Sequence, residues 1–374
     1  MRQYLLKIHW QMIILWQTNK DIPEKVALGC FLLFFAGNCS EIIRIDKSTI
    51  TVLSVVKFWC IIRGNDKKEA RKMGALEEKI LKLKQEKNAV IMAHYYVPDE
   101  VQAIADDIGD SYYLSERATK TDADIIVLCG VSFMGESAKL LNPEKKVLLP
   151  DLQADCPMAH MASPERIRMV REQYEDVAVV CYINSTAELK TQADVCVTSA
   201  NAEKIVRALP NKYIYFIPDQ HLGQHVAEKV PEKKFIFNDG YCPIHRQIRK
   251  EDVLRAKEEH PDAVFLVHPE CAKEVVDLAE YAGSTSGIIK YASASERKEF
   301  LIGTEAGVFY ELKKQNPDKV FYPINIHQDC PGMKLVTLEK IYDVLLHETN
   351  EVQLDKMTME RAKQPLTRML ELAK

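Results

Sequence analysis

The chain lacks several of the common signatures of ligand-binding proteins. It has no Gly-x-Gly-x-x-Gly motif and no Walker loop, so a nucleotide cofactor held by a glycine-rich turn is not indicated. No cysteines show the Cys-x2-Cys spacing of structural zinc sites. The net charge of −4 at pH 7 provides no global basic field for nucleic acid. The apolar run at residues 26–36 is shorter than the ~20 residues that span a bilayer.

Cysteine is present but sparse. Ten cysteines in 374 residues do not form the dense framework of a secreted disulfide scaffold, so a reducing cytoplasm is the expected compartment. Only Cys156, Cys242 and Cys330 are followed by proline. The intervals between them are 86 and 88 residues. Such a near-constant interval predicts one structural unit used three times, each copy carrying one thiol.

The first 72 residues differ in composition from the rest. They hold all three tryptophans, Trp10, Trp16 and Trp59. They contain 12 Lys and Arg against 6 Asp and Glu, whereas the remainder contains 38 against 48. We therefore expect residues 1–72 to be an extension outside the core, with Met73 as the working start. A targeting or membrane-surface segment is the alternative.

From Met73 onward, short β-branched runs alternate with helical patterns, which is typical of parallel sheets covered by helices on both faces. The expected strands cover residues 89–93, 124–130, 146–150, 177–184, 193–199, 213–217, 234–238, 263–270 and 319–324. The expected helices include residues 99–109, 135–141, 201–209 and 271–282, and one that begins at Ser185. Helices from Thr337 onward should pack across the copies.

The predicted fold class is α/β. We expect three similar three-layer αβα units with parallel sheets, in pseudo-threefold arrangement around a central cluster site. The predicted units are residues 73–175, residues 176–262, and residues 263–374, the last including the C-terminal helices.

The ends of the opening strands show the same repeat independently. These strands end at His94, Tyr182 and His268, which are 88 and 86 residues apart. Ligands of parallel sheets bind beyond the carboxyl ends of the strands, so the polar residues there should line one cavity. Those residues are His94, Tyr96, Tyr182, Asn184, Ser199, His268 and Glu270.

Three thiolates from three units would bind a soft metal. A 4Fe–4S cluster normally takes four thiolates, so three would leave one iron open to act as a Lewis acid on a substrate oxygen. That arrangement favours removal of water from a hydroxy acid. An electron-transfer or iron-sensing protein, and a zinc hydrolase, remain alternatives. The cysteines within predicted strands or at a helix start are expected to be buried apolar residues, namely Cys129, Cys181, Cys196 and Cys271.

Seven short motifs, in order along the chain, carry a resemblance to a known family. They are "MAHYY", "IGDS", "ADCPM", "INSTAE", "VTSANA", "HPEC" and the third Cys-Pro, in "CPGM". Together they resemble quinolinate synthase, an iron–sulfur enzyme of de novo NAD biosynthesis, from about Met73 to the C-terminus. The resemblance implies condensation of iminoaspartate with dihydroxyacetone phosphate to quinolinate, with loss of phosphate and two waters. It also implies a functional link to an aspartate-oxidising enzyme.

The resemblance further implies which residues form the site. One 4Fe–4S cluster per chain would be held by Cys156, Cys242 and Cys330, with its open iron acting as Lewis acid for dehydration. Glu270 and Tyr96 would be the acid–base groups, with His245 near the cluster. Substrate would be bound by His94, Ser111, Tyr182, Asn184, Ser199, His268, Glu270 and Thr285. Without the resemblance, Glu270 would be read as an acid in the first turn of a helix.

Overall fold

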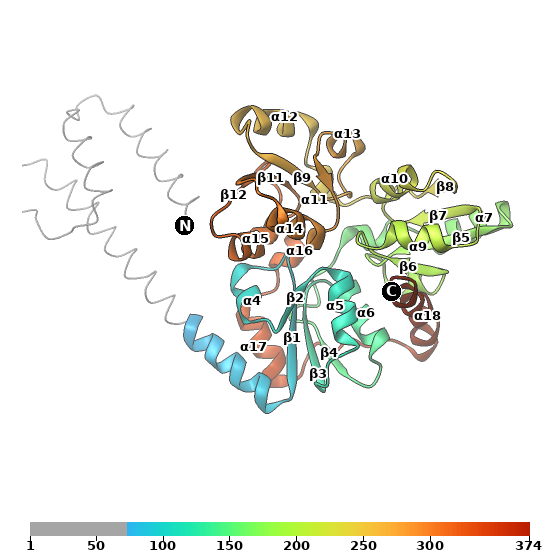
Figure 1. Cartoon of the computed structure of the whole chain (residues 1–374). Helices are drawn as coiled ribbons and strands as arrows, with labels where there is room; N and C mark the ends of the chain where they lie inside the picture. The colour runs from blue at the N-terminus through green and yellow to red at the C-terminus, as the bar shows by residue number, and fades with distance from the viewer. Residues whose placement is uncertain (1–72) are drawn as a thin grey trace, which may run out of the picture. The chain divides into compact units, whose positions relative to one another are not determined.

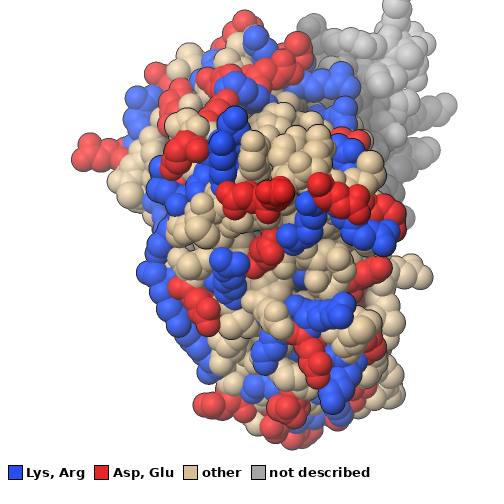
Figure 2. Space-filling view, turned by 90° about the vertical axis from the view of Figure 1, so that its right-hand side faces the viewer, with Lys and Arg blue, Asp and Glu red and all other residues tan. Residues whose placement is uncertain are grey.

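The computed structural model describes residues 73–374, of which residues 75–374 form one compact unit (Figure 1). The expectation for residues 1–72 lies outside the described residues. Within residues 73–374, no helix combines the length and apolar character needed to cross a bilayer. Lys and Arg lie among Asp and Glu over most of the face in Figure 2.

Three parallel four-stranded sheets make up the core, and all three have the same strand order. In each, the strand that comes second along the chain lies at one edge, followed by the first, third and fourth. The first sheet comprises β1 (Ala89–His94), β2 (Asp107–Gly109), β3 (Ile125–Cys129) and β4 (Lys146–Leu148). The second comprises β5 (Val177–Tyr182), β6 (Val195–Val197), β7 (Tyr213–Ile217) and β8 (Lys234–Phe237). The third comprises β9 (Val264–Val267), β10 (Tyr281–Ala282), β11 (Glu299–Gly303) and β12 (Val320–Pro323).

Helices cover the sheets and connect their parallel strands. Those around the first sheet are a helix over residues 73–86, α4 (Asp99–Ile104), α5 (Ser111–Ala118) and α6 (Ser132–Leu141), followed along the chain by the 3₁₀ turn η1 (Pro157–His160). The second sheet has α7 (Pro164–Gln173), which contacts β5, then α8 (Ala187–Lys190), α9 (Ala202–Ala208) and α10 (Gln220–Lys229), followed by the short α11 (Pro243–Arg246). The third has α12 (Lys250–Glu259), which contacts α13 (Lys273–Val276), then α14 (Thr285–Ala294), the 3₁₀ turn η2 (Ala306–Val308), α15 (Phe309–Gln315) and α16 (Pro331–Lys334). Two further helices, α17 (Leu338–His347) and α18 (Lys356–Leu372), complete the chain.

This architecture confirms the predicted fold class. The central strands are buried along their length, as in β3 and β5, because helices cover both faces of a parallel sheet. The three sheets, teal, green and gold to orange in Figure 1, surround a common centre. The boundaries at residues 175/176 and 262/263 stay a prediction.

One arrangement, which we call the acidic hook, repeats in all three sheets: an Asp or Glu bonds to one residue of the first strand through both its backbone N–H and its carboxylate. Asp106 donates its N–H to the Ile91 carbonyl (2.9 Å) and accepts the Ile91 N–H with its carboxylate (2.9 Å). Asp194 does the same with Val179, at 2.9 and 2.7 Å. Glu280 does it with Phe265, at 3.0 and 2.7 Å. Each hook lies just before the second strand of its sheet and draws that strand alongside the first.

Two predicted helices are wrong at their C-terminal ends, where an acidic hook draws the chain into a strand instead. The helix predicted over residues 99–109 ends at Ile104, and residues 107–109 pair with β1 as β2. The helix predicted over residues 271–282 is the short α13, followed by β10. In both cases two hydrogen bonds to a distant strand override the local helical pattern. Strand β11 was not predicted at all.

The C-terminal helix lies across two units. Helix α18 contacts α8, α9 and β6 of the second unit and also α6 of the first. Its Arg368 donates to the Asp194 carbonyl at 3.1 Å. This confirms the expectation that the last helices pack across the copies.

A second junction joins the loop after β1 to the loop after β11. The buried Gln102 side chain donates to the carbonyls of Tyr95 (2.9 Å), Val97 (3.0 Å) and Gly307 (3.0 Å). A Cβ atom at Gly307 would lie 2.6 Å from the Tyr95 carbonyl oxygen and 2.7 Å from the Tyr96 Cα. Only glycine permits this approach of two backbones.

The substitution Gly307→Ala should therefore lower the free energy of unfolding by about 1–3 kcal/mol, because two backbone segments must separate to admit the methyl group. Urea unfolding followed by circular dichroism measures this. Gly74→Ala is the matched control, since no atom beyond its chain neighbours and its own helix backbone lies within 4 Å of the added Cβ. Equal stability of the two variants would contradict the close approach.

Candidate active site

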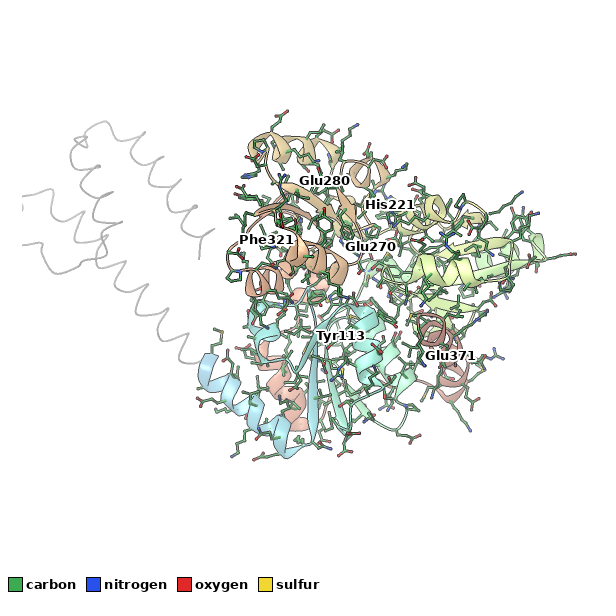
Figure 3. The ribbon with its side chains drawn as sticks, in the orientation of Figure 1. Tyr113, His221, Glu270, Glu280, Phe321 and Glu371 are labelled. Atoms are coloured by element: carbon green, nitrogen blue, oxygen red, sulfur yellow. The ribbon has the colours of Figure 1, made fainter. Side chains whose placement is uncertain are left out.

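A cavity with about 690 Å³ of empty space, its mouth included, lies where the three sheets meet. Figure 3 shows Glu270 at this meeting point. Every site residue predicted from the sequence lines the cavity: His94, Tyr96, Ser111, Cys156, Tyr182, Asn184, Ser199, Cys242, His245, His268, Glu270, Thr285 and Cys330. Residues from distant parts of the chain therefore share one space.

Two histidines at strand ends adopt the same local structure. His94 Nδ1 accepts the backbone N–H of Tyr96 at 3.2 Å, and His268 Nδ1 accepts that of Glu270 at 3.3 Å. Burial lowers the pKa of His94 to about 4 and that of His268 to about 3, so both rings are neutral at pH 7. Because Nδ1 accepts, Nε2 carries the proton, and His268 Nε2 lies 3.1 Å from the Ser199 hydroxyl. The histidines are neutral hydrogen-bond donors.

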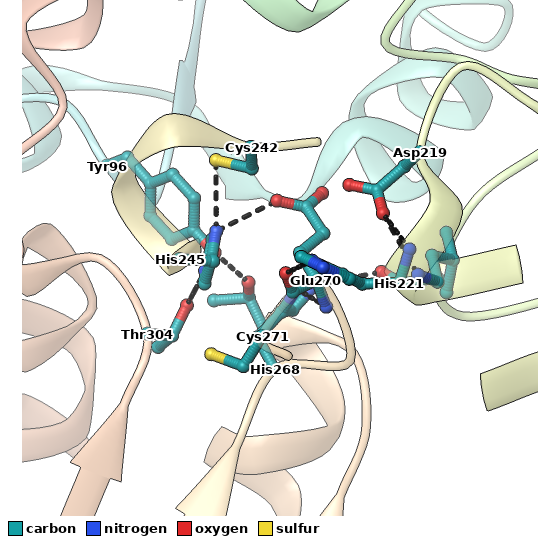
Figure 4. Close-up of polar contacts among 12 residues, drawn as sticks. Tyr96, Asp219, His221, Cys242, His245, His268, Glu270, Cys271 and Thr304 are labelled. Carbon is teal, nitrogen blue, oxygen red and sulfur yellow. Dashed lines mark hydrogen bonds and ion pairs between the residues drawn. The ribbon is translucent and has the colours of Figure 1, made fainter. Parts of the chain in front are cut away.

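Glu270 is a buried carboxylate held by two donors (Figure 4). Tyr182 donates to Oε1 at 2.5 Å, and His245 Nδ1 lies 2.8 Å from Oε2. Burial alone raises the pKa of Glu270, but the facing imidazoles of His245 and His268 and the Tyr182 hydroxyl outweigh it and the net direction is downward. Glu270 is therefore ionised at neutral pH and accepts hydrogen bonds from both neighbours.

Tyr96 is protonated at neutral pH. Its hydroxyl lies 2.7 Å from that of Thr285 and 2.8 Å from that of Thr304. Burial first, and then the nearby Glu270, raise its pKa well above the usual value. A phenol of this kind can donate a proton or a hydrogen bond, whereas Glu270 can accept one.

The three Cys-Pro pairs share one backbone structure. Cys156, Cys242 and Cys330 are each the N-cap of a short helix whose first residue is the proline, and none uses its side chain as a cap. The thiols are therefore available to a ligand. We call each cysteine with its short helix a Cys-Pro loop.

The Cys-Pro loops pack against one another. Gly332 lies so close to the Asp155 carbonyl that a Cβ atom would overlap it, which joins the third loop to the first. Asn238, in the segment that leads into the second loop, donates its side-chain N–H to the carbonyl of Met161, which directly follows the first loop, at 2.8 Å. The three loops thus converge although they lie far apart in sequence.

The chemistry of the thiols fits a shared cationic centre. Burial, with the charges of Cys330 and Glu270, raises the pKa of Cys156 to about 12. Burial also raises the pKa of Cys242 and of Cys330. Thiolates at these positions are disfavoured until a positive centre binds them. The donor set therefore fits the iron–sulfur centre that the resemblance implies.

The spacing of the donor atoms bears on the size of that centre. Among the described residues, only Cys242, His245 and Glu270 offer three ligand atoms within 4.8 Å of one another, and the three Cys-Pro sulfurs form no such group. A single zinc ion at ~2.3 Å from each sulfur would hold three thiolates within about 4 Å. The three Cys-Pro sulfurs therefore do not all lie as close together as the ligands of a single zinc ion would.

Other cysteines are packing residues. Cys129, Cys181, Cys196 and Cys271 are all buried, as predicted. Tyr95 is likewise buried in the core of the third unit.

Sequence reasoning missed two buried residues beside the site, Thr304 and Glu305. Glu305 accepts the Cys330 N–H at 3.0 Å and pairs with Lys334 Nζ at 2.8 Å. Lys334 in turn donates to the Tyr96 carbonyl at 2.7 Å. Thr304 and Glu305 follow β11 directly, so the rule that ligands bind beyond strand ends would have found them had that strand been predicted.

The neutral histidines predict how stability varies with pH. The unfolded chain protonates His268 near pH 6.5 and the folded chain only near pH 3, so the unfolded state binds more protons between these values. The free energy of unfolding should fall as the pH is lowered from 7 to 5, by up to ~1.4 kcal/mol per pH unit for each such histidine. Chemical unfolding at several pH values measures the slope.

His268→Gln should flatten this slope, and His327→Gln, at an exposed position, should leave it unchanged. A slope in His268→Gln equal to that of the unsubstituted protein would show that His268 is already charged in the folded state.

Comparison with known proteins identifies relatives over most of the chain. A family model described as Quinolinate synthetase A protein matches residues 78–371. A quinolinate synthase of Caldicellulosiruptor saccharolyticus is 51% identical over 298 residues, which cover 80% of this chain and 98% of that protein. Quinolinate synthases of Clostridioides difficile and Aquifex aeolicus are 50% and 49% identical, over 80% of this chain and 98% and 94% of their own lengths.

Proposed function

This chain belongs to the quinolinate synthetase A family, and we propose that it condenses iminoaspartate with dihydroxyacetone phosphate to quinolinate, phosphate and two waters, in de novo NAD biosynthesis. The observation that carries the proposal is a single cavity that combines neutral hydrogen-bond donors, a buried carboxylate, a protonated phenol and three thiols. Each of these groups has a task in a dehydrating condensation of anionic substrates.

The proposed substrate-binding residues supply donors for two carboxylates and a phosphate. His94 and His268 donate through Nε2 without carrying charge of their own. Ser111 and Thr285 begin helices α5 and α14, whose first N–H groups favour anions. Tyr182, Asn184 and Ser199 add two hydroxyls and an amide to the same cavity.

Proton transfer is assigned to Glu270 and Tyr96. We propose that Glu270 takes a proton from substrate carbon or hydroxyl, with Tyr182 and His245 holding its two oxygens. Tyr96 donates a proton or hydrogen bond to a leaving oxygen, because its raised pKa keeps it protonated. Each such group contributes about 10²–10⁴-fold to a rate.

We propose Cys156, Cys242 and Cys330 as the ligands of one 4Fe–4S cluster per chain. A cluster bound there would supply a Lewis-acidic iron that polarises a substrate oxygen. The support is the packing of the three Cys-Pro loops and the pKa values of their thiols. A mononuclear zinc site is the second candidate, since Cys242, His245 and Glu270 lie within 4.8 Å of one another.

The cellular setting is part of the proposal. An aspartate-oxidising enzyme would supply the iminoaspartate in the cytoplasm, where the thiols stay reduced. We further propose that residues 73–374 carry the activity, which is consistent with the family match over residues 78–371.

The test is an anaerobic preparation of the full chain assayed for metal and for activity. We expect about four iron and four sulfide per chain, and formation of quinolinate from iminoaspartate and dihydroxyacetone phosphate. Glu270→Gln should keep the iron and sulfide but lose at least ~10²-fold in turnover, because the proton acceptor is gone.

Glu274→Gln is the matched control, since Glu274 is exposed near the start of α13. It should behave as the unsubstituted protein does. Zinc in place of iron and sulfide, or a fully loaded protein that makes no quinolinate, would overturn the proposal. Retained turnover in Glu270→Gln would remove Glu270 from its role.

A further inference from the structure

A buried hydrogen-bond chain links the two proposed acid–base groups through a residue that has no assigned role. The Thr304 hydroxyl lies 2.8 Å from the Tyr96 hydroxyl and 2.9 Å from His245 Nε2. His245 Nδ1 lies 2.8 Å from Glu270 Oε2. Figure 4 shows Thr304 below Tyr96 and His245, and Thr304 does not line the cavity itself.

The three linked side chains come from three different sheets. Tyr96 follows β1, His245 lies in α11 after β8, and Thr304 follows β11. Their relative positions therefore depend on how the sheets meet. Thr304 is fully buried, so no solvent replaces its hydroxyl as a partner for the other two.

The backbone of Thr304 is fixed independently of its hydroxyl. The buried Gln328 side chain donates to the carbonyls of Thr304 and Ile302. The next residue, Glu305, accepts the Cys330 N–H. Gln328 and the Cys330 N–H thus hold the backbone around Thr304 in place, and the β-branched side chain of Thr304 has a restricted χ1 angle. The position of the Thr304 hydroxyl is therefore fixed by the backbone and by the restricted χ1 angle.

The hydroxyl satisfies two partners at once. His245 Nδ1 faces two acceptors, Glu270 Oε2 at 2.8 Å and Cys242 Sγ at 3.2 Å. Its other nitrogen, Nε2, needs a partner on the far side of the ring, and Thr304 supplies it. A threonine hydroxyl has one proton and two lone pairs, so it can serve Nε2 and the Tyr96 hydroxyl together.

We propose that Thr304 is a positioning residue for the condensation: its hydroxyl fixes the His245 ring toward Glu270 and the Tyr96 phenol toward the cavity. This inference rests on the proposed function, because Tyr96 and Glu270 are its acid–base groups. Thr304 touches no substrate and acts only through Tyr96 and His245.

The test compares Thr304→Val, which keeps the shape and loses the hydroxyl, with Thr304→Ser, which keeps the hydroxyl. In the loaded, anaerobic protein, Thr304→Val should lower kcat by about 10–100-fold, the usual effect of removing a partner that orients a site residue. KM should change less than kcat, and iron and sulfide contents should equal those of the unsubstituted protein. Thr304→Ser should recover most of kcat. Ser137→Ala, which removes another buried hydroxyl, should change neither constant.

A double-mutant cycle separates positioning from general destabilisation. If Thr304 acts through Tyr96, adding Thr304→Val to Tyr96→Phe should lower kcat much less than Thr304→Val does alone. Additive losses would overturn the proposal, as would unchanged kcat in Thr304→Val. A folded, loaded Thr304→Ser that is as impaired as Thr304→Val would also overturn it.

A structural readout does not depend on turnover. In a crystal structure of Thr304→Val, the His245 ring should turn, so that Nδ1 leaves hydrogen-bond distance of Glu270. An unchanged ring would contradict the inference. If the unsubstituted, loaded protein makes no quinolinate, the proposed function fails, and the ring position still decides whether Thr304 orients His245.

Discussion

The convergence of three half-buried cysteines on one cavity is the constraint on which the rest of the structure depends. Cys156, Cys242 and Cys330 sit in loops that pack against one another, and burial raises the pKa of each thiol. Deprotonating the three thiols in this site costs free energy, and it becomes favourable only when a positively charged centre binds them. The fold has to hold the three loops together against that cost.

Repetition is how the fold achieves this. Every sheet has the same strand order, and every one uses an acidic hook, Asp106, Asp194 or Glu280, to align its second strand with its first. A lysine before each fourth strand donates to carbonyls of the segment that leads into the third strand: Lys145 and Lys233 to two carbonyls each, and Lys319 to three. Three copies built alike bring equivalent strand ends and equivalent Cys-Pro loops to one centre.

The sequence predicted the parts of the site that repeat. The Cys-Pro interval and the strand ends at His94, Tyr182 and His268 recur at 86 and 88 residues, so they stand out without a structure. Ser111, Thr285 and His245 came only from the family resemblance, because nothing in their local sequence distinguishes them from ordinary helix residues.

What could not be predicted depends on contacts between distant segments. Strands β2 and β10 form because hooks reach the first strands of their sheets, which a local helical pattern does not reveal. Nothing in the local sequence distinguishes Thr304 from other threonines. Its contacts are with Tyr96 and His245, which lie 208 and 59 residues away in the sequence. Positions fixed by non-local hydrogen bonds are those that local patterns miss.

The most direct measurement is X-ray diffraction at the iron absorption edge from crystals grown without oxygen. The proposed cluster predicts one compact iron peak per chain, bounded by the sulfur atoms of Cys156, Cys242 and Cys330. No iron at that position, or a single metal ion bound by Cys242, His245 and Glu270, would contradict the account.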